Sequence, residues 1–249
     1  IDKDSYGNTE ITEAEAMITE ESSISEDTRL KENIDNSVRL LLVEDNEELL
    51  NTVSKILAKQ YLVVKAKNGV EALQEIEKSQ IDIIISDVMM PEMDGLELCR
   101  IVKGNIETSH IPILLLTAKN STEDRIECYN VGADGYISKP FDIKLLQARI
   151  NNFLSYKQKQ QQKFKQDPEL EISTLNYTSL DEEFLKNVVK LIEDNLSEPD
   201  FDNEAFAQQL NMSKSTLYRK IKTITGLSPI ELIKNIRMKH ASTMLRQQY

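Results

Sequence analysis

Four short motifs carry side chains that together could handle a phosphoryl group. They are the acidic pair Glu44 and Asp45, the single carboxylate Asp87, the hydroxyl of Thr117 and the lysine Lys139. Carboxylates packed together raise each other's pKa unless a cation joins them, and hard oxygen ligands suit Mg²⁺. A metal, a lysine and a hydroxyl around one carboxylate can position a phosphoryl group and neutralise its charge. The fold must therefore bring together residues that lie far apart in the sequence.

The pattern around these motifs predicts how the fold does so. Short apolar runs occupy residues 38–43, 62–66, 81–86, 113–117 and 136–138, and helix-like stretches occupy residues 47–59, 69–78, 95–103, 122–131 and 142–153. Five apolar strands, each followed by a helix, predict a doubly wound α/β fold with a five-stranded parallel sheet. Neighbouring strands lie about 5 Å apart, and the binding crevice of such a sheet lies at their carboxyl ends.

Each of the four motifs lies at the carboxyl end of a predicted strand. Asp87 ends the third strand, which we expect to be central, so Asp87 is the expected nucleophile. Glu44 and Asp45 are expected to hold Mg²⁺ directly or through water, together with Asp87. The backbone carbonyl of Met89 could supply a further metal ligand.

The remaining two groups are assigned to the phosphoryl oxygens. Lys139 would contact these oxygens, and Thr117 would donate a hydrogen bond to one of them. Each motif alone has a simpler explanation, since Asp45 or Asn46 could cap the first helix and a Lys-Pro pair is commonly only a turn. Their joint occurrence at four strand ends favours a real site.

Residues 38–154 resemble the response-regulator receiver domain (CheY-like) over its full length. The resemblance rests on VEDN, on DVMMPEMDG around Asp87, on LLLTA, and on GADGYISKPF with its Lys139-Pro140 pair. It implies a flavodoxin-like fold, phosphoryl transfer from a histidine kinase to Asp87 with Mg²⁺, and a cis peptide before Pro140. It implies a phosphoacceptor with at most slow autophosphatase activity, and no enzyme in the usual sense. Tyr136 matches the family's switch aromatic, which moves inward with Thr117, although a half-buried strand tyrosine explains Tyr136 equally well.

A second pattern, which is helical only, begins at residue 181. Helices are predicted over residues 183–196, 203–210, 213–225 and 228–247. The second and third of these, joined by a short turn, read as a helix-turn-helix, with Ser213 as the N-cap and Gly226 after the last turn. The outward face of the third helix carries side chains suited to bases and phosphates: Lys214, Ser215, Tyr218, Arg219 and Lys222. A solvated basic helix in an ordinary bundle is the alternative.

Residues 181–249 resemble the N-terminal half of an AraC-type DNA-binding domain. The resemblance rests on SKSTLYRKIKTITGLSPIELIKNIRMKHASTML. It implies that Ser215, Tyr218 and Arg219 face bases and that Lys222 contacts the DNA backbone. That family has two helix-turn-helix units joined by a long helix, and this sequence ends at Tyr249 within or just after the joining helix. We therefore expect the second unit to be missing.

The net charge of −12 is unevenly distributed. Residues 1–37 carry net −8 and are expected to be a flexible acidic linker, whereas residues 211–249 carry net +7. Residues 155–180 are rich in Gln and Lys and are expected to be a second linker, whose first half could continue the preceding helix. The chain begins at Ile1 without a signal peptide, as expected for a piece of a longer polypeptide.

The few cysteines and histidines exclude several other classes of protein. Cys99 and Cys128 form neither a disulfide framework nor a metal-binding spacing, which favours a cytoplasmic location. His110 and His240 lack the surroundings of a kinase phosphoacceptor, and both are expected at the surface. No apolar run is long enough to span a membrane, so we expect no membrane contact by this fragment, although a full-length parent is free to be membrane-anchored.

These patterns together predict a phosphorylation-controlled transcription regulator. The combination resembles the C-terminal part of a hybrid two-component system, in which the histidine kinase lies in the same polypeptide, but a free-standing regulator could have the same two domains. Other expected partners are DNA, through the complete output domain, and a second copy of the chain in a phosphorylation-dependent homodimer. The alternative function is a protein-interaction or phosphate-sink module whose truncated helices do not bind DNA.

Overall fold

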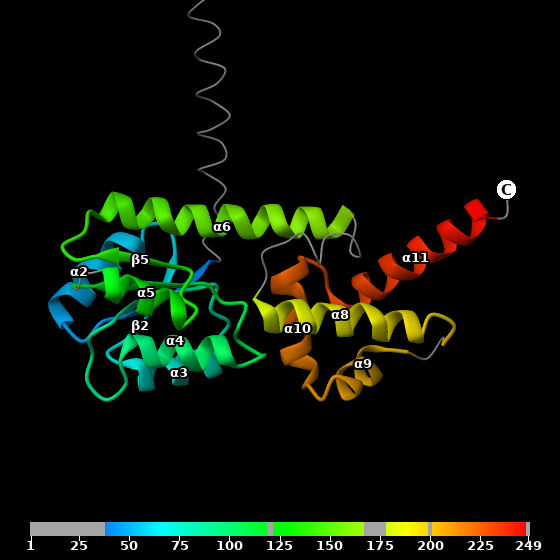
Figure 1. The fold of residues 1–249 in the computed structure, drawn as a ribbon, viewed down its shortest axis with the longest axis horizontal. Helices are drawn as coiled ribbons and strands as arrows, with labels where there is room; N and C mark the ends of the chain where they lie inside the picture. The colour runs from blue at the N-terminus through cyan, green and yellow to red at the C-terminus, as the bar shows by residue number, and fades with distance from the viewer. Residues whose placement is uncertain (1–37, 119–121, 167–177, 199–200, 248–249) are drawn as a thin grey trace, which may run out of the picture.

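The computed structural model describes residues 38–118, 122–166, 178–198 and 201–247 (Figure 1). Its sheet has five parallel strands in the order β2-β1-β3-β4-β5. The strands are β1 (Arg39–Val43), β2 (Leu62–Ala66), β3 (Ile83–Asp87), β4 (Ile113–Thr117) and β5 (Gly135–Ser138). The predicted doubly wound α/β fold with a five-stranded parallel sheet is confirmed. We call residues 38–118 and 122–154 the α/β unit.

Alternating side chains of the central strands fill two separate cores. Leu41 and Ile84 face a core formed with α3 (Gly69–Lys78), α4 (Gly95–Gly104) and α5 (Thr122–Asn130). Leu40 and Ile83, one residue earlier on each strand, face a core formed with α2 (Glu47–Leu57) and the first half of α6 (Ile143–Gln166). Because side chains alternate across a strand, an apolar run without polar positions is required when both faces of a sheet are covered.

The helix after β1 settles one alternative left open by the sequence. The side chain of Asn46 caps α2 by accepting a hydrogen bond from the backbone N–H of Leu49 at 3.0 Å. Asp45 is therefore not needed as a cap, and its carboxylate is exposed beside the end of β1.

Helix α6 extends well beyond the α/β unit. It runs for 24 residues, so the first part of the expected linker at residues 155–180 continues the helix. Leu146, Ile150 and Leu154 pack in a core of the α/β unit, whereas Phe164 is fully buried in the core of the helices that follow. One helix therefore contributes to both hydrophobic cores.

The C-terminal helices form a separate bundle. They are α8 (Ser179–Asp194), α9 (Asn203–Gln209), α10 (Lys214–Thr225) and α11 (Pro229–Gln247), and we call them the helical unit. Ser213 caps α10, and Gly226 ends it in the left-handed conformation with φ 72°, both as predicted. Figure 1 shows this unit beyond the right-hand ends of the strands, next to the second half of α6.

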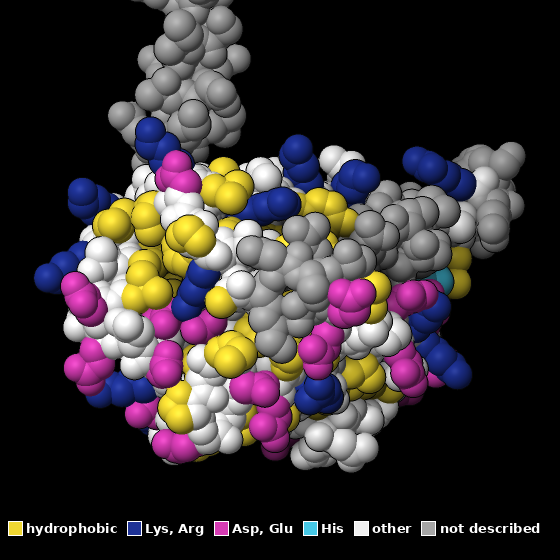
Figure 2. All heavy atoms as spheres, turned by 60° about the vertical axis from the view of Figure 1, so that its left-hand side comes forward, with side chains coloured by type: hydrophobic (Ala, Val, Ile, Leu, Met, Phe, Trp, Pro, Cys, Tyr) yellow, Lys and Arg dark blue, Asp and Glu magenta, His cyan; other side chains and the backbone are white. Residues whose placement is uncertain are grey.

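Figure 2 shows acidic side chains interspersed with basic and apolar ones over the α/β unit. Within the ranges that the structure describes, no helix combines the length and apolar character needed to cross a membrane. The acidic linker expected at residues 1–37 lies outside the described residues, as does the part of the second linker from residue 167 to 177.

Candidate functional site at the carboxyl ends of the strands

The register of the sheet places the predicted site residues side by side. Glu44 and Asp45 follow β1 directly, and Asp87 is the last residue of β3. Val43 pairs with Ser86 across β1 and β3, and Asp87 itself pairs with Leu116. Thr117 pairs with Ser138, the residue before Lys139, so the ends of four strands meet at one edge of the sheet.

Three carboxylates and one ammonium group converge at this edge. One carboxylate oxygen from each of Glu44, Asp45 and Asp87 lies within 4.8 Å of the others. Lys139 Nζ lies 2.8 Å from Glu44 Oε2 and 2.8 Å from Asp87 Oδ2. Glu44 and Asp87 are 3% and 6% exposed, whereas Asp45 is exposed. The cluster is thus mostly buried but open on the side of Asp45.

The charges of this cluster influence one another. Burial raises the pKa of Glu44, and the nearby charge of Asp87 raises it further against the opposing effect of Lys139. Burial disfavours the charged form of Lys139, but its hydrogen bonds to Asp87 and Glu44 outweigh burial and raise its pKa. One lysine is shared among three acids, so the cluster retains excess negative charge that a bound cation would offset.

Backbone geometry around Asp87 depends on a glycine that the sequence analysis did not single out. A Cβ added to Gly95 would lie 2.1 Å from the carbonyl oxygen of Asp87, so a larger residue cannot occupy this position without a backbone shift. The backbone N–H of Gly95 donates to the carbonyl of Val88 at 3.0 Å, which fixes the loop after β3. The glycine in the DVMMPEMDG motif was the available signal, because close backbone approach is a common reason for a glycine.

The other predicted site residues lie around this cluster. Thr117 is 3% exposed at the end of β4, and its carbonyl accepts a hydrogen bond from the backbone N–H of Lys139 at 2.7 Å. The Lys139-Pro140 peptide is cis, as the family resemblance implied. Tyr136 is half-buried and its ring makes an edge contact with Tyr129 at a centroid distance of 5.7 Å. Met89, whose carbonyl is the further candidate ligand, has an exposed side chain two residues after Asp87.

The five predicted DNA-contacting residues lie elsewhere, on α10. Lys214, Ser215 and Tyr218 are exposed, and Arg219 and Lys222 are partly exposed. Lys214 pairs with Glu204 at 2.7 Å, and Lys222 lies 3.8 Å from Glu231. These residues share an accessible face, as predicted, and two of its cations already have acidic neighbours.

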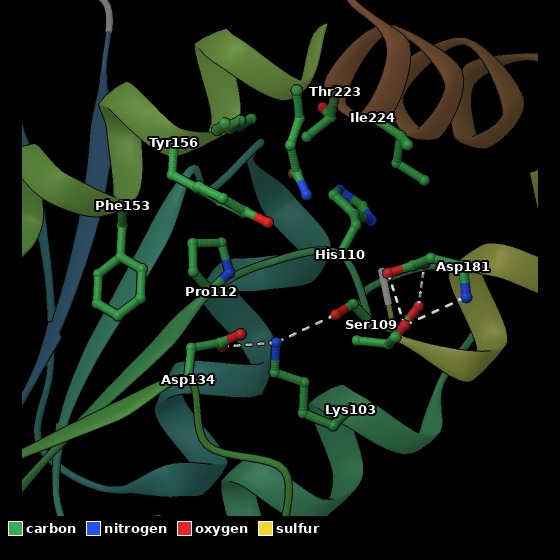
Figure 3. Close-up of a pocket in the computed structure, with 13 residues that line it drawn as sticks. Lys103, Ser109, His110, Pro112, Asp134, Phe153, Tyr156, Asp181, Thr223 and Ile224 are labelled. Carbon is green, nitrogen blue, oxygen red and sulfur yellow. Dashed lines mark hydrogen bonds and ion pairs between the residues drawn. The ribbon is translucent and has the colours of Figure 1, made fainter. Parts of the chain in front are cut away.

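One predicted surface residue is only partly exposed. His110 precedes β4, and its Nδ1 atom is buried without a hydrogen-bond partner among the described residues. It lines a cavity of about 280 Å³ between the α/β unit, α6 and α10, where Tyr156 and Thr223 are further lining residues (Figure 3). The surface prediction holds only in part because the helical unit covers this turn, and a contact between distant segments leaves no local pattern in the sequence.

Known proteins match this chain mainly over the α/β unit. Residues 40–151 match the family model described as "Response regulator receiver domain". The chain is 43% identical over 120 residues to a protein named "Probable transcriptional regulator ycf29" from Pyropia yezoensis, which covers 48% of this chain and 54% of that protein. A crystal structure of the signal receiver domain of a histidine kinase from Syntrophus aciditrophicus aligns with 36% identity and a TM-score of 0.46, covering 48% of this chain and 91% of that one.

A further relative matches beyond the α/β unit. A protein named "Histidine kinase P4" from Formosa agariphila is 41% identical over 206 residues, which is 83% of this chain and 15% of that protein. An alignment of this length must include part of the helical unit or of residues 1–37 in addition to the family match. The chain thus spans between 15% and 54% of the length of these two curated relatives.

Proposed function

Residues 40–151 are a response regulator receiver domain, and from this premise we propose that Asp87 accepts a phosphoryl group from the phosphohistidine of a histidine kinase. The α/β unit is called the receiver domain from here on. The observation that carries the proposal is the position of Asp87 between Lys139, at 2.8 Å, and two further carboxylates. In the transfer, a carboxylate oxygen of Asp87 bonds to phosphorus while the phosphorus–nitrogen bond breaks, and the imidazole nitrogen keeps the electron pair.

The residues around Asp87 suit the charge changes of this transfer. Lys139 reaches both Asp87 and Glu44, so it can stay beside Asp87 and contact the new phosphoryl oxygens. The hydroxyl of Thr117, at the end of the neighbouring strand, would donate to one of these oxygens and move inward together with Tyr136. Such groups act because they are already oriented before charge develops on the phosphoryl group.

The donor set also suits Mg²⁺. Glu44, Asp45, Asp87 and the backbone carbonyl of Met89 are oxygen ligands, and the three carboxylates lie close enough to share one ion. Glu44 accepts the hydrogen bond from Lys139 on Oε2, so Oε1 would remain available to the ion, directly or through water. When bound, the ion would neutralise negative charge on the phosphoryl group.

The proposed output is control of transcription through DNA binding by α10. Lys214, Ser215, Tyr218, Arg219 and Lys222 would form the contact surface, the lysines to phosphates and Arg219 to a base edge. Phosphorylated receivers would pair and place two helical units on adjacent half-sites. The exposure of this face supports the proposal, as does its excess of basic residues.

An alternative output is supported by the acidic neighbours of this face. Lys214 and Lys222 lie beside Glu204 and Glu231, which reduces the positive charge that α10 offers to phosphates. The helical unit would then bind a partner protein, or the receiver would act as a phosphate sink. DNA binding separates the two outputs. If α10 contacts DNA, binding should weaken with salt and be lost in Arg219→Ala, but not in the matched control Arg246→Ala on α11.

Phosphorylation itself is tested with a small phosphodonor. Incubation with Mg²⁺ and acetyl phosphate should add one phosphate, measured by mass spectrometry of the intact protein. Asp87→Asn should abolish the addition, whereas Asp94→Asn should not, because Asp94 caps α4 outside the cluster and asparagine caps helices equally well. Undiminished labelling of Asp87→Asn would refute the acceptor assignment.

A further inference from the structure

The contact between the receiver domain and the helical unit contains a buried ion pair. Lys220 Nζ on α10 lies 2.5 Å from Asp181 Oδ1 on α8. The same Nζ donates to the hydroxyl of Ser109 at 3.1 Å. This hydroxyl donates to Asp181 Oδ1 at 2.7 Å, a bond that is drawn in Figure 3. Lys220, Asp181 and Ser109 are 1%, 2% and 0% exposed. A residue of the receiver domain therefore completes an ion pair between two helices of the helical unit.

In the docked arrangement, hydrogen bonds from both units offset part of the cost of burying this ion pair. Burial of two charges costs more than their attraction returns unless hydrogen bonds satisfy their remaining groups. Burial lowers the pKa of Lys220, although Asp181 attracts its charged form. Ser109 supplies one of the extra hydrogen bonds, and the hydroxyl of Thr178 donates to Asp181 Oδ2 at 2.7 Å. Loss of the receiver surface would remove a hydrogen-bonding group from the pair and expose its charges to solvent.

A second attachment runs through α6. Leu154 of this helix packs in the core of the receiver domain, and Phe164 packs in the core of the helical unit. Gln161 Nε2 donates to the carbonyl of Thr223 on α10 at 2.8 Å. A Cβ on Gly226 would lie 3.0 Å from Lys165, which shows how closely the end of α10 approaches α6. Helix α10 is thus held by α6 on one side and by Ser109 on another.

The face of α10 that is docked differs from the face proposed to contact DNA. Leu217 and Ile221 point into the core of the helical unit, and Lys220 and Thr223 point toward the receiver domain. Arg219 and the other proposed contact residues remain on the accessible face. Docking therefore fixes the orientation of the contact face without covering it.

We propose that Ser109, Asp181 and Lys220 form an interdomain lock, which with α6 makes the receiver domain and helical unit one rigid body. The lock lies next to the amino end of β4, at the opposite end of the strand from Thr117 and the acidic pocket. It leaves Asp87 accessible to a kinase while the helical unit is docked. A further consequence rests on the proposed function: when two receivers pair, the lock would fix the distance between their two α10 helices.

The lock is tested first without DNA. Ser109→Asp adds a larger side chain and a second carboxylate to a buried site in which Lys220 already matches Asp181, so the unmatched charge should break the contact. Calorimetry of the wild type should show one unfolding transition, and the variant two, with the helical unit melting about 5 °C or more below the receiver domain. Small-angle scattering should show an expanded particle for the variant only.

The matched control adds the same charge in the same turn. Asn105 is exposed, and its side-chain oxygen accepts a hydrogen bond from the backbone of Glu107, a bond that aspartate retains. Asn105→Asp should behave as the wild type.

Acetyl phosphate labelling of Asp87 in Ser109→Asp should stay near the wild-type rate, which verifies a folded receiver domain. If Ser109→Asp does not fold, Ser109→Ala replaces it in the same measurements. Its two unfolding transitions should be separated by a smaller temperature difference. The lock would be overturned if the folded Ser109 variants showed a single unfolding transition and an unchanged scattering profile. It would also be overturned if Asn105→Asp showed the same two unfolding transitions as Ser109→Asp.

A DNA arm separates this inference from the proposed function. The phosphorylated wild type should lose about tenfold in affinity when half a helical turn is inserted between two half-sites, whereas Ser109→Asp should lose about twofold or less. Equal spacing dependence in both proteins would overturn the fixed distance. If neither protein binds DNA, DNA binding by this chain alone fails, while the lock is still decided by the unfolding and scattering measurements.

Discussion

Two lysine–carboxylate clusters at opposite ends of the receiver domain differ in what surrounds the lysine. Lys139 lies between Glu44 and Asp87 with 20% of its side chain exposed, and hydrogen bonds to these acids raise its pKa despite burial. Lys220 pairs with Asp181 with 1% of its side chain exposed, and burial lowers its pKa. The first cluster has more acids than bases, whereas in the second one base matches one acid.

The difference indicates what each cluster can do. An excess of acid at an open edge suits a site that binds a cation and an incoming phosphoryl group, because the ligand completes the charge balance. In a matched pair closed from solvent, each charge already has its partner, which suits a role in holding elements together. Substitutions at the two lysines should therefore affect different properties.

The largest expected effect is on the stability of the helical unit. Lys220→Met leaves Asp181 buried without its cation, so the free energy of unfolding should fall by about 3–5 kcal/mol. Lys220→Met combined with Asp181→Leu should recover much of this loss, because the double variant leaves no unpaired charge. Urea unfolding followed by circular dichroism measures both changes. An equally unstable double variant would show that packing, and not the ion pair, determines the effect.

The next largest effect should appear in phosphorylation and hardly in stability. Lys139→Met removes a cation that contacts the incoming phosphoryl group, so the initial rate of labelling by acetyl phosphate should fall about 100-fold. Urea unfolding should change less than in Lys220→Met, because the acids that Lys139 leaves behind lie at an edge that is open to water on the side of Asp45. A labelling rate close to that of the wild type would remove Lys139 from the proposed site.

The sequence was sufficient for the first cluster because its residues are marked locally. Asp87 and Thr117 each end an apolar run, and parallel strands bring such ends together whatever the rest of the fold does. The sequence could not establish the side-chain arrangement, in which Lys139 bridges Glu44 and Asp87. Nor did it indicate the role of Gly95, whose constraint arises only when α4 packs against the end of β3.

The residues of the second cluster have no such local signal in the sequence. Lys220 is one of several basic residues in a basic helix, and its partner Ser109 lies 111 positions away in an ordinary polar turn. Phe164 stands in a Gln/Lys-rich stretch that reads as a linker, yet it is fully buried. These residues are buried because the two units dock against each other. Hydrophobic periodicity shows only which face of a single element is apolar, so it does not indicate this burial.

The third prediction uses His110, which lies next to the second cluster. Burial lowers the pKa of His110 to about 3, and Lys220, Lys157 and Lys103 add to this effect against Asp181. In the unfolded chain the imidazole titrates near its ordinary pKa of 6.5, so between pH 6.5 and pH 3 the unfolded chain binds more protons. Stability from this residue is present above pH 6.5 and falls on acidification, by about 1.4 kcal/mol per pH unit.

A non-titrating variant isolates this contribution. Between pH 7 and pH 5 the wild type should lose about 2 kcal/mol more unfolding free energy than His110→Gln, measured by urea unfolding at both values. Parallel pH profiles for the wild type and His110→Gln would show that this imidazole is hydrated in solution.

The smallest expected effect concerns an exposed lysine–carboxylate pair, which extends the comparison to a third environment. Lys214 and Glu204 are 2.7 Å apart with side chains 60% and 57% exposed, so Glu204→Gln should change the unfolding free energy by about 0.5 kcal/mol or less. The same change frees Lys214 for a phosphate. If α10 contacts DNA, binding by Glu204→Gln should be tighter and its salt dependence steeper than in the wild type, measured by fluorescence anisotropy at several salt concentrations. If the wild type binds DNA and Glu204→Gln binds it equally well, Lys214 lies outside the contact surface. The contact would then depend on Arg219 and Tyr218.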